Sequence, residues 1–298
     1  MDEAFSAYIE KSRTSLGALP QTLQEQMSGS LNSLLAKDRF EHHETIDDAL
    51  VALLDRTQEE FGEDVVATFV RRLVLDLCEH QLLHVQVPQA LVDLQLHSLS
   101  SCMESVQAMQ DSKLRFDHFR KPLEKELSLA AGRTIFVGGA WMVERRCLAP
   151  TPLSGGVLRM LDRRPLRPLL SAVGVYRDCL VIHTLERNLR LFKPEHHETA
   201  LRNIAIVLDA DTSLAGIYRQ SWFLDPRVVE LSPKLAFLTT IPLQNGAQLN
   251  RIGPATPSMI KDATTRAPAR QKAFEAGTYV PANFAYFWAR EDVLAWAS

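Results

Sequence analysis

The spacing of apolar residues changes near Gly132, and this change limits the possible folds more than any other feature of the sequence. Before Gly132, apolar residues recur at intervals of three and four, as between Val66 and Leu73, which is typical of helices with one buried face. After it, short apolar runs alternate with breaks at proline and glycine. We therefore expect a mixed α+β fold, with an N-terminal helical bundle over 1–132 followed by a mixed-sheet α/β domain over 133–298.

Glycine, proline and polar residues divide each half into shorter elements. The expected helices of the first half span 3–36 with a break near Gly17 and Pro20, 45–61, 63–85, 88–109 and 112–131. The expected strands of the second half span 134–137, 140–146, 179–182, 189–192, 214–224 and 284–288, with helices at 199–208 and 259–276. The apolar run 235–241 fits a strand or a short helix equally well.

Charge and composition indicate which classes of binding partner, and which cellular compartment, we expect for this protein. The formal net charge of the 298 residues is -3, which gives no overall attraction to nucleic acid or to acidic membranes, so we expect neither as a partner. The partner we expect is a small-molecule substrate. The first residues lack the basic and apolar regions of a signal peptide, and no apolar stretch approaches the ~18 residues that cross a bilayer. Four cysteines without a Cys-x-x-Cys pair favour reduced thiols, and so a soluble protein of the cytoplasm.

Arginines cluster locally in the second half, around Arg145, Arg146 and Arg163. One interpretation is a solvated loop, because arginine is common on ordinary protein surfaces. The alternative is a binding site for an anion, since guanidinium groups form paired hydrogen bonds with carboxylates and phosphates.

His183 follows directly on the apolar run 179–182, which we interpret as a buried strand. Ends of strands are common positions for catalytic bases, and a nearby Glu186 or Asp178 could adjust the protonation of the imidazole. We therefore predict His183 or Glu186 as a general base. The alternative is a hydrogen-bonded histidine at the edge of a sheet.

His80 and His84 are four residues apart on the most regular predicted helix, so they share a face and could bind a metal ion together. They also continue the apolar stripe of that helix. The alternative is therefore a pair of core histidines with polar partners, for which Asp76, one turn before His80, is a candidate.

The pentapeptide Glu-His-His-Glu-Thr occurs twice, at 41–45 and at 195–199. Histidine and glutamate are metal ligands, but adjacent histidines point apart, unlike the ligands of His-Glu-x-x-His, which lie one turn apart. We expect each copy to precede a helix and to supply acidic residues and a threonine cap, with Thr199 capping the second helix. The standard nucleotide-loop, nucleophile-elbow and zinc-protease motifs are absent from the sequence.

The segment 269–279, Ala-Arg-Gln-Lys-Ala-Phe-Glu-Ala-Gly-Thr-Tyr, leads into the expected strand that ends at Trp288. It resembles the end of the GNAT-type acyltransferases, in which a helix ending Phe-Tyr-Glu-Lys-x-Gly-Phe precedes a final strand. The resemblance covers about 214–290 and implies acyl-CoA as cofactor. The pyrophosphate loop of that family, [RQ]xxGx[GA], is missing, with 244–247 the nearest segment, so the resemblance assigns no pyrophosphate-binding residue.

Three functional hypotheses follow. The first is an acyltransferase acting on a small intracellular metabolite, with His183 or Glu186 as base and the arginines around Arg145 as an anion clamp. The second is a metal-dependent enzyme that uses His80 and His84. The third is a non-enzymatic binding or regulatory module whose helical half offers a docking surface.

Overall fold

The computed structural model describes residues 3–36, 48–84, 87–111, 116–147, 178–265 and 267–298. The chain divides into two compact units, one formed by Met1–Glu144 with Thr184–Leu189 and the other by Arg145–His183 with Arg190–Ser298. Helices at the N-terminus are followed by a sheet-containing region, which confirms the predicted mixed α+β class.

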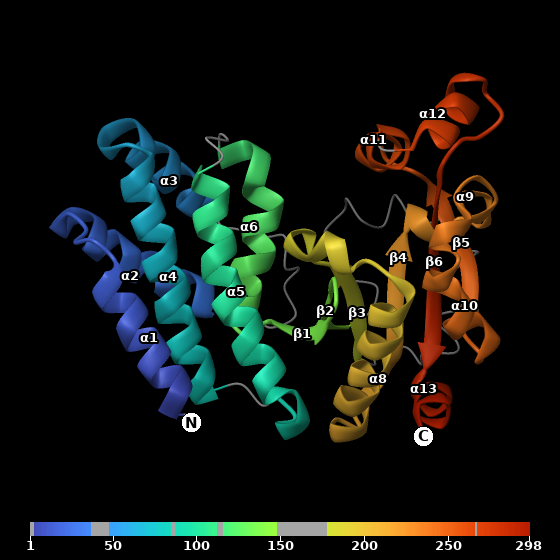
Figure 1. Ribbon diagram of the computed structural model, residues 1–298, viewed down its shortest axis with the longest axis horizontal. Coiled ribbons are helices and arrows are strands. Elements are labelled where there is room, and N and C mark those ends of the chain that lie inside the picture. The colour runs from blue at the N-terminus through green and yellow to red at the C-terminus, as the bar shows by residue number, and fades with distance from the viewer. Residues whose placement is uncertain (1–2, 37–47, 85–86, 112–115, 148–177, 266) are drawn as a thin grey trace. The chain divides into compact units, whose positions relative to one another are not determined.

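The first unit is built mainly from helices (Figure 1). They are α1 (Glu3–Ser15), α2 (Gln21–Ala36), α3 (Asp48–Phe61), α4 (Glu63–His84), the short η1 (Gln89–Leu91), α5 (Val92–Asp111) and α6 (Phe116–Ala130). α4 contacts α1, α2, α3, α5 and α6 and is the centre of the unit. Its apolar stripe, including Phe69, Leu73 and Leu77, is at most 1% exposed, as the spacing of these residues predicts.

A hairpin of β1 (Thr134–Gly138) and β2 (Trp141–Cys147) follows α6. Gly139 and Ala140 form its turn. Gly138, the last residue of β1, and Gly139 have φ of 101° and 57°, in the left-handed region that favours glycine. The pairing shifts register between Phe136 and Gly138, so the glycine pair accompanies a β-bulge. The amide of Gln95 bonds both backbone groups of Phe136.

The second unit contains β3 (Asp178–Thr184), β4 (Leu214–Ser221), β5 (Gln248–Pro254) and β6 (Ala282–Ala289), in the order β3-β4-β6-β5. β3 and β4 are parallel and are connected through α8 (Pro194–Ala210), whereas β6 runs antiparallel to both of its neighbours. The other helical elements are η2 (Glu186–Leu191), η3 (Trp222–Leu224), α9 (Pro226–Leu231), η4 (Pro233–Leu235), α10 (Phe237–Gln244), α11 (Pro257–Thr265), α12 (Pro268–Glu275) and α13 (Arg290–Ala297).

Proline placement corrects two helix predictions. α8 begins at Pro194 because proline at the first helical position leaves no donor unpaired. Thr199 therefore lies inside the helix and donates its hydroxyl to the Glu195 carbonyl, rather than capping the helix. The single helix expected over 259–276 is two helices, because Pro268 starts the second one.

The strand expected over 189–192 is wrong, since η2 extends to Leu191. The backbone of this segment forms hydrogen bonds within local turns instead of pairing with a strand. Asn188 N–H donates to the Leu185 carbonyl, and Lys193 N–H donates to the Leu191 carbonyl. The ambiguous run 235–241 lies mostly in helix α10, and the strand expected over 214–224 ends at Ser221. Within the described residues, no helix combines the length and apolar character that crossing a bilayer requires.

Candidate functional site

The carboxyl ends of the parallel strands β3 and β4 lie at the same edge of the sheet, which is where open α/β sheets commonly bind ligands. Val181 on β3 is paired with Tyr218 on β4. Because side chains alternate along a strand, His183 lies on the same face of the sheet as Val181, and Gln220 lies on the same face as Tyr218. We name this side the Tyr218 face of the sheet.

Tyr218 and Gln220 form the polar part of this face on β4. The Tyr218 hydroxyl donates to Gln220 Oε1 at 2.7 Å. Burial raises the pKa of Tyr218, and the positive charge of Arg146 only partly opposes that shift. The phenol is therefore protonated at neutral pH and can act as a hydrogen-bond donor.

Two of the predicted site residues are thus associated with this region. His183 lies on the same face of β3, and the charge of Arg146 interacts with Tyr218. Both side chains are half-buried, so neither is fully removed from solvent. No pattern in the sequence identifies Tyr218 or Gln220 as a site residue. Only the pairing register of β3 with β4 brings them to His183.

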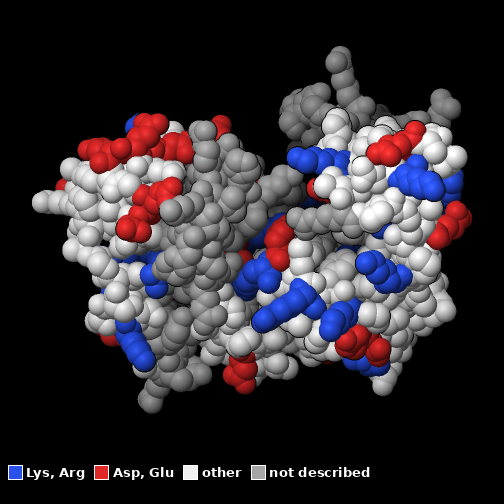
Figure 2. Space-filling model, turned by 45° about the horizontal axis from the view of Figure 1, so that its top comes forward, with Lys and Arg blue, Asp and Glu red and all other residues white. Residues whose placement is uncertain are grey.

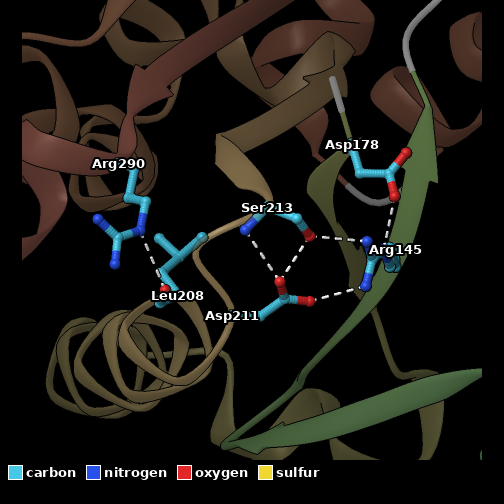
Figure 3. Close-up of polar contacts among 6 residues, drawn as sticks. All are labelled: Arg145, Asp178, Leu208, Asp211, Ser213 and Arg290. Carbon is cyan, nitrogen blue, oxygen red and sulfur yellow. Dashed lines mark hydrogen bonds and ion pairs between the residues drawn. The ribbon is translucent and has the colours of Figure 1, made fainter. Parts of the chain in front are cut away.

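Arg145, a residue of β2, lies beside the opposite ends of β3 and β4, where each of these strands begins (Figure 3). Its Nε donates to Asp178 Oδ2 at 2.6 Å, its Nη1 to Asp211 Oδ2 at 2.7 Å, and its Nη2 to Ser213 Oγ at 2.8 Å. Asp178 begins β3, and Ser213 directly precedes β4. Each guanidinium nitrogen therefore has a partner in the protein, and two carboxylates surround one cation.

His183, the predicted base, and Arg145, the predicted anion-binding residue, therefore lie near opposite ends of β3 and do not share one site. His183 is five residues beyond Asp178 on β3, a separation of about 16 Å at the usual rise of a strand. Figure 3 also shows Arg290, at the start of α13, donating from Nε to the carbonyl of Leu208 at 3.1 Å. The Arg290 guanidinium therefore lies beside the last turn of α8, where helix carbonyls attract positive charge.

Glu186, the alternative base, lies in the helical unit together with Lys125. Its Oε1 accepts from Lys125 Nζ at 2.6 Å, and the same ammonium donates to the Thr184 carbonyl at 2.7 Å. The Glu186 carboxylate is thus part of an ion pair. Arg163, the third predicted anion-binding residue, lies outside the described residues.

The predicted metal pair lies on α4 of the helical unit. His80 is half-buried, and the side chain of His84 lies outside the described part of the structure. Asp76, the expected partner of His80, accepts from Arg13 Nη2 at 2.7 Å. Among the side chains that the structure describes, no group of three or more histidines, cysteines, aspartates or glutamates is arranged to hold a metal ion.

The other face of the sheet carries a buried polar cluster, which we name the Arg219 face. Arg219 on β4 is paired with Tyr286 on β6, and its Nη1 lies 3.2 Å from Nε2 of His197 in the first turn of α8. His197 belongs to the second Glu-His-His-Glu-Thr copy, here inside a helix. Arg219 is the only charged residue among the first six residues of β4, which are otherwise apolar. This contrast is the feature of the sequence that could have identified it as a buried polar residue.

Aromatic rings lie beside this cluster. The ring of Phe237 lies 5.3 Å from His197 and 5.6 Å from Phe192, which in turn lies 5.6 Å from Phe223. Burial, followed by the charge of Arg219, lowers the pKa of His197 well below its usual value. The imidazole is therefore neutral at physiological pH, and its Nε2 accepts from the guanidinium.

A groove of about 250 Å³ lies between α2 and α3 of the helical unit. Leu34, Leu50 and Leu53 supply its apolar wall, and Gln26 and Arg56 supply polar groups. The groove is one candidate for the docking surface that the hypothesis of a binding module expects on the helical half.

Charged side chains are interspersed on the surface that Figure 2 shows, where Lys and Arg lie among Asp and Glu instead of forming one continuous field. On the part of this face that the structure describes, anion recognition would therefore depend on individual groups rather than on a broad basic surface. Comparisons with known protein families, with curated proteins and with solved structures find no match.

Proposed function

We propose that the α/β unit is an acyltransferase for a small intracellular metabolite, with its reaction centre on the Tyr218 face at the carboxyl ends of β3 and β4. The observation that carries this proposal is the position of His183 on the same face as Tyr218 and Gln220. A histidine and a protonated phenol on adjacent strands supply a proton acceptor and a proton donor within one region.

Acyl transfer from a thioester needs both roles. The amine nitrogen of the acceptor attacks the carbonyl carbon, the carbon–sulfur bond breaks, and the leaving sulfur takes up a proton. In this proposal His183 accepts the proton that the amine loses. The Tyr218 hydroxyl turns from Gln220 to donate a hydrogen bond to the leaving sulfur, which takes up its proton from water. Arg146 stabilises the negative charge that develops in the same region.

The resemblance to GNAT-type acyltransferases supports acyl-CoA as the donor. In that family a helix and a glycine precede the last strand, and here α12 ends at Glu275, Gly277 has a φ of 67°, and β6 is the last strand in the chain. Cys78 and Cys102 are buried free thiols, which favours a reducing compartment such as the cytoplasm.

The test combines binding with turnover. Acetyl-CoA should raise the melting temperature of the full chain because a ligand stabilises the state that binds it. The release of free CoA from acetyl-CoA should then depend on added small amines. The variant His183→Asn should keep the thermal shift but lose about 10²-fold or more in turnover, the usual contribution of a general base.

The matched control is His97→Asn, which changes an exposed histidine on α5 of the helical unit. It should leave binding and turnover unchanged. No thermal shift with saturating acetyl-CoA would remove the proposal, and full turnover in His183→Asn would remove His183 from it. Metal analysis of the same preparation tests the alternative of a metal-dependent enzyme built on His80 and His84.

A further inference from the structure

Arg219 is a cation buried in the interior of the α/β unit. The residue is 2% exposed, and its side chain lies on the opposite face of the sheet from Tyr218. Burial lowers the pKa of the guanidinium, yet arginine stays charged in proteins because its pKa is so high. The protein therefore holds a full positive charge at this position.

The neighbours of this charge are neutral. His197, 1% exposed, is uncharged at neutral pH, and burial raises the pKa of Tyr286, so that the phenol is also uncharged. The phenol is the second group that interacts with the guanidinium. Within the described part of the chain, no aspartate or glutamate forms an ion pair with Arg219.

Arg270 shows how the same unit accommodates another buried guanidinium. Its Nε donates to the Ala263 carbonyl and its Nη1 to Ser232 Oγ, each at 2.5 Å, and its guanidinium lies 5.0 Å from the ring centre of Trp222. Arg270 thus has two oxygen acceptors and an aromatic face. Arg219 has a nitrogen acceptor and a phenol.

An unpaired buried charge is costly, and the cost falls when an anion is buried beside it. We infer that Arg219, together with His197 and Tyr286, forms a binding site for a small oxyanion, a carboxylate or a phosphate. The guanidinium offers the paired donors that suit either group. The phenol offers a further donor, and the first turn of α8, which carries His197, is favourable for negative charge.

This inference goes beyond the proposed acyl transfer, because it concerns the other face of the sheet and does not require acyl-CoA. A negatively charged metabolite could supply the oxyanion as its carboxylate, and a phosphorylated one as its phosphate. The shared chemistry is a compact group with two or more oxygen acceptors.

The first experiment measures the melting temperature of the full chain in sodium chloride, sodium acetate and sodium phosphate at equal pH and ionic strength. An oxyanion at ~100 times its dissociation constant should raise the melting temperature by roughly 5–10 °C relative to chloride. A rise with acetate alone identifies a carboxylate site, and a rise with phosphate alone a phosphate site. Equal melting temperatures in all three salts overturn the inference.

The second experiment removes the charge. Arg219→Met should abolish the oxyanion-dependent shift. In chloride it should melt no lower than the wild type, because it deletes a buried charge that no carboxylate among the described residues neutralises. The matched control Arg270→Met should melt several degrees lower in chloride and keep the oxyanion shift. A shift that persists in Arg219→Met overturns the inference.

If Arg219→Met does not fold, Arg219→Lys keeps the charge but lacks the paired donors, and should weaken oxyanion binding by about tenfold or more. Undiminished binding in Arg219→Lys then counts against the site. The variant His183→Asn should keep the oxyanion shift, which separates failure of this inference from failure of the proposed acyl transfer.

Discussion

His197 is the residue whose burial has the clearest consequence for stability. Its pKa in the folded protein is lowered, first by burial and then by Arg219, so unfolding at mildly acidic pH is accompanied by proton uptake. This proton uptake fixes the direction in which the free energy of unfolding changes with pH. Stability is unaffected well above pH ~6.5, the pKa of an unfolded histidine, and decreases as the pH falls below it, by up to about 1.4 kcal/mol per pH unit.

Urea unfolding at pH 7.5 and pH 5.5 checks this expectation. The variant His197→Gln keeps an acceptor for Arg219 but cannot be protonated, so its free energy of unfolding should change less between the two pH values than that of the wild type. His196→Gln, at the neighbouring half-exposed position, is the control and should behave as the wild type. Equal pH dependence in wild type and His197→Gln would contradict the assignment.

Among the elements, β4 depends on one glycine for its pairing with β6. Gly216 has a φ of 152°, and a Cβ there would lie 2.2 Å from the backbone oxygen of Trp288. The pairing of β4 with β3 also shifts register here, with Asp178 opposite Leu214 but Leu180 opposite Ile217. Gly216 therefore permits both an irregular strand and a close approach of β6.

Gly216→Ala should lower the free energy of unfolding by about 2–4 kcal/mol, because backbone atoms cannot move aside as a flexible side chain can. Gly253→Ala, in β5, is the matched control, since a Cβ at that position meets no atom within 4 Å. It should change stability by less than about 1 kcal/mol. Urea unfolding measures both, and similar effects of the two variants would show that the close approach to Trp288 is unimportant.

At the scale of the whole molecule, the chain leaves the α/β unit after His183, one residue before the end of β3, and the segment 184–189 belongs to the helical unit. There Arg187 pairs with Glu126 and donates to the Ser98 carbonyl at 3.0 Å and to Ser98 Oγ at 2.6 Å. Asn188 Nδ2 donates to the Gly139 carbonyl at 2.9 Å. The Glu126 side chain is only 1% exposed, so its charge depends on Arg187.

Arg187→Met should therefore destabilise the protein by about 3–5 kcal/mol, because it leaves a buried carboxylate without a counter-charge. Replacing both partners, Glu126→Met with Arg187→Met, should recover much of that loss. Arg190→Met, at an exposed position nearby in sequence, is the control and should cost less than about 0.5 kcal/mol. If Arg187→Met and Arg190→Met unfold at the same urea concentration, the pair does not stabilise the fold.

The sequence by itself determined the features that depend on near neighbours in the chain. The apolar spacing of α4, the alternation in β6, the glycine turn between β1 and β2, and the position of His183 near the end of β3 follow from residues a few positions apart. The mixed α+β class follows from the order of these patterns.

Only the tertiary structure decided which side chains meet. Arg145 has its partners 33, 66 and 68 residues away, and these contacts place the predicted anion-binding residue in an ion-pair network. The register of β3 with β4 places Tyr218 and Gln220 on the face of His183, and the approach of α8 buries Arg219 beside His197. Such contacts depend on strand register and helix packing, which local residue patterns do not encode.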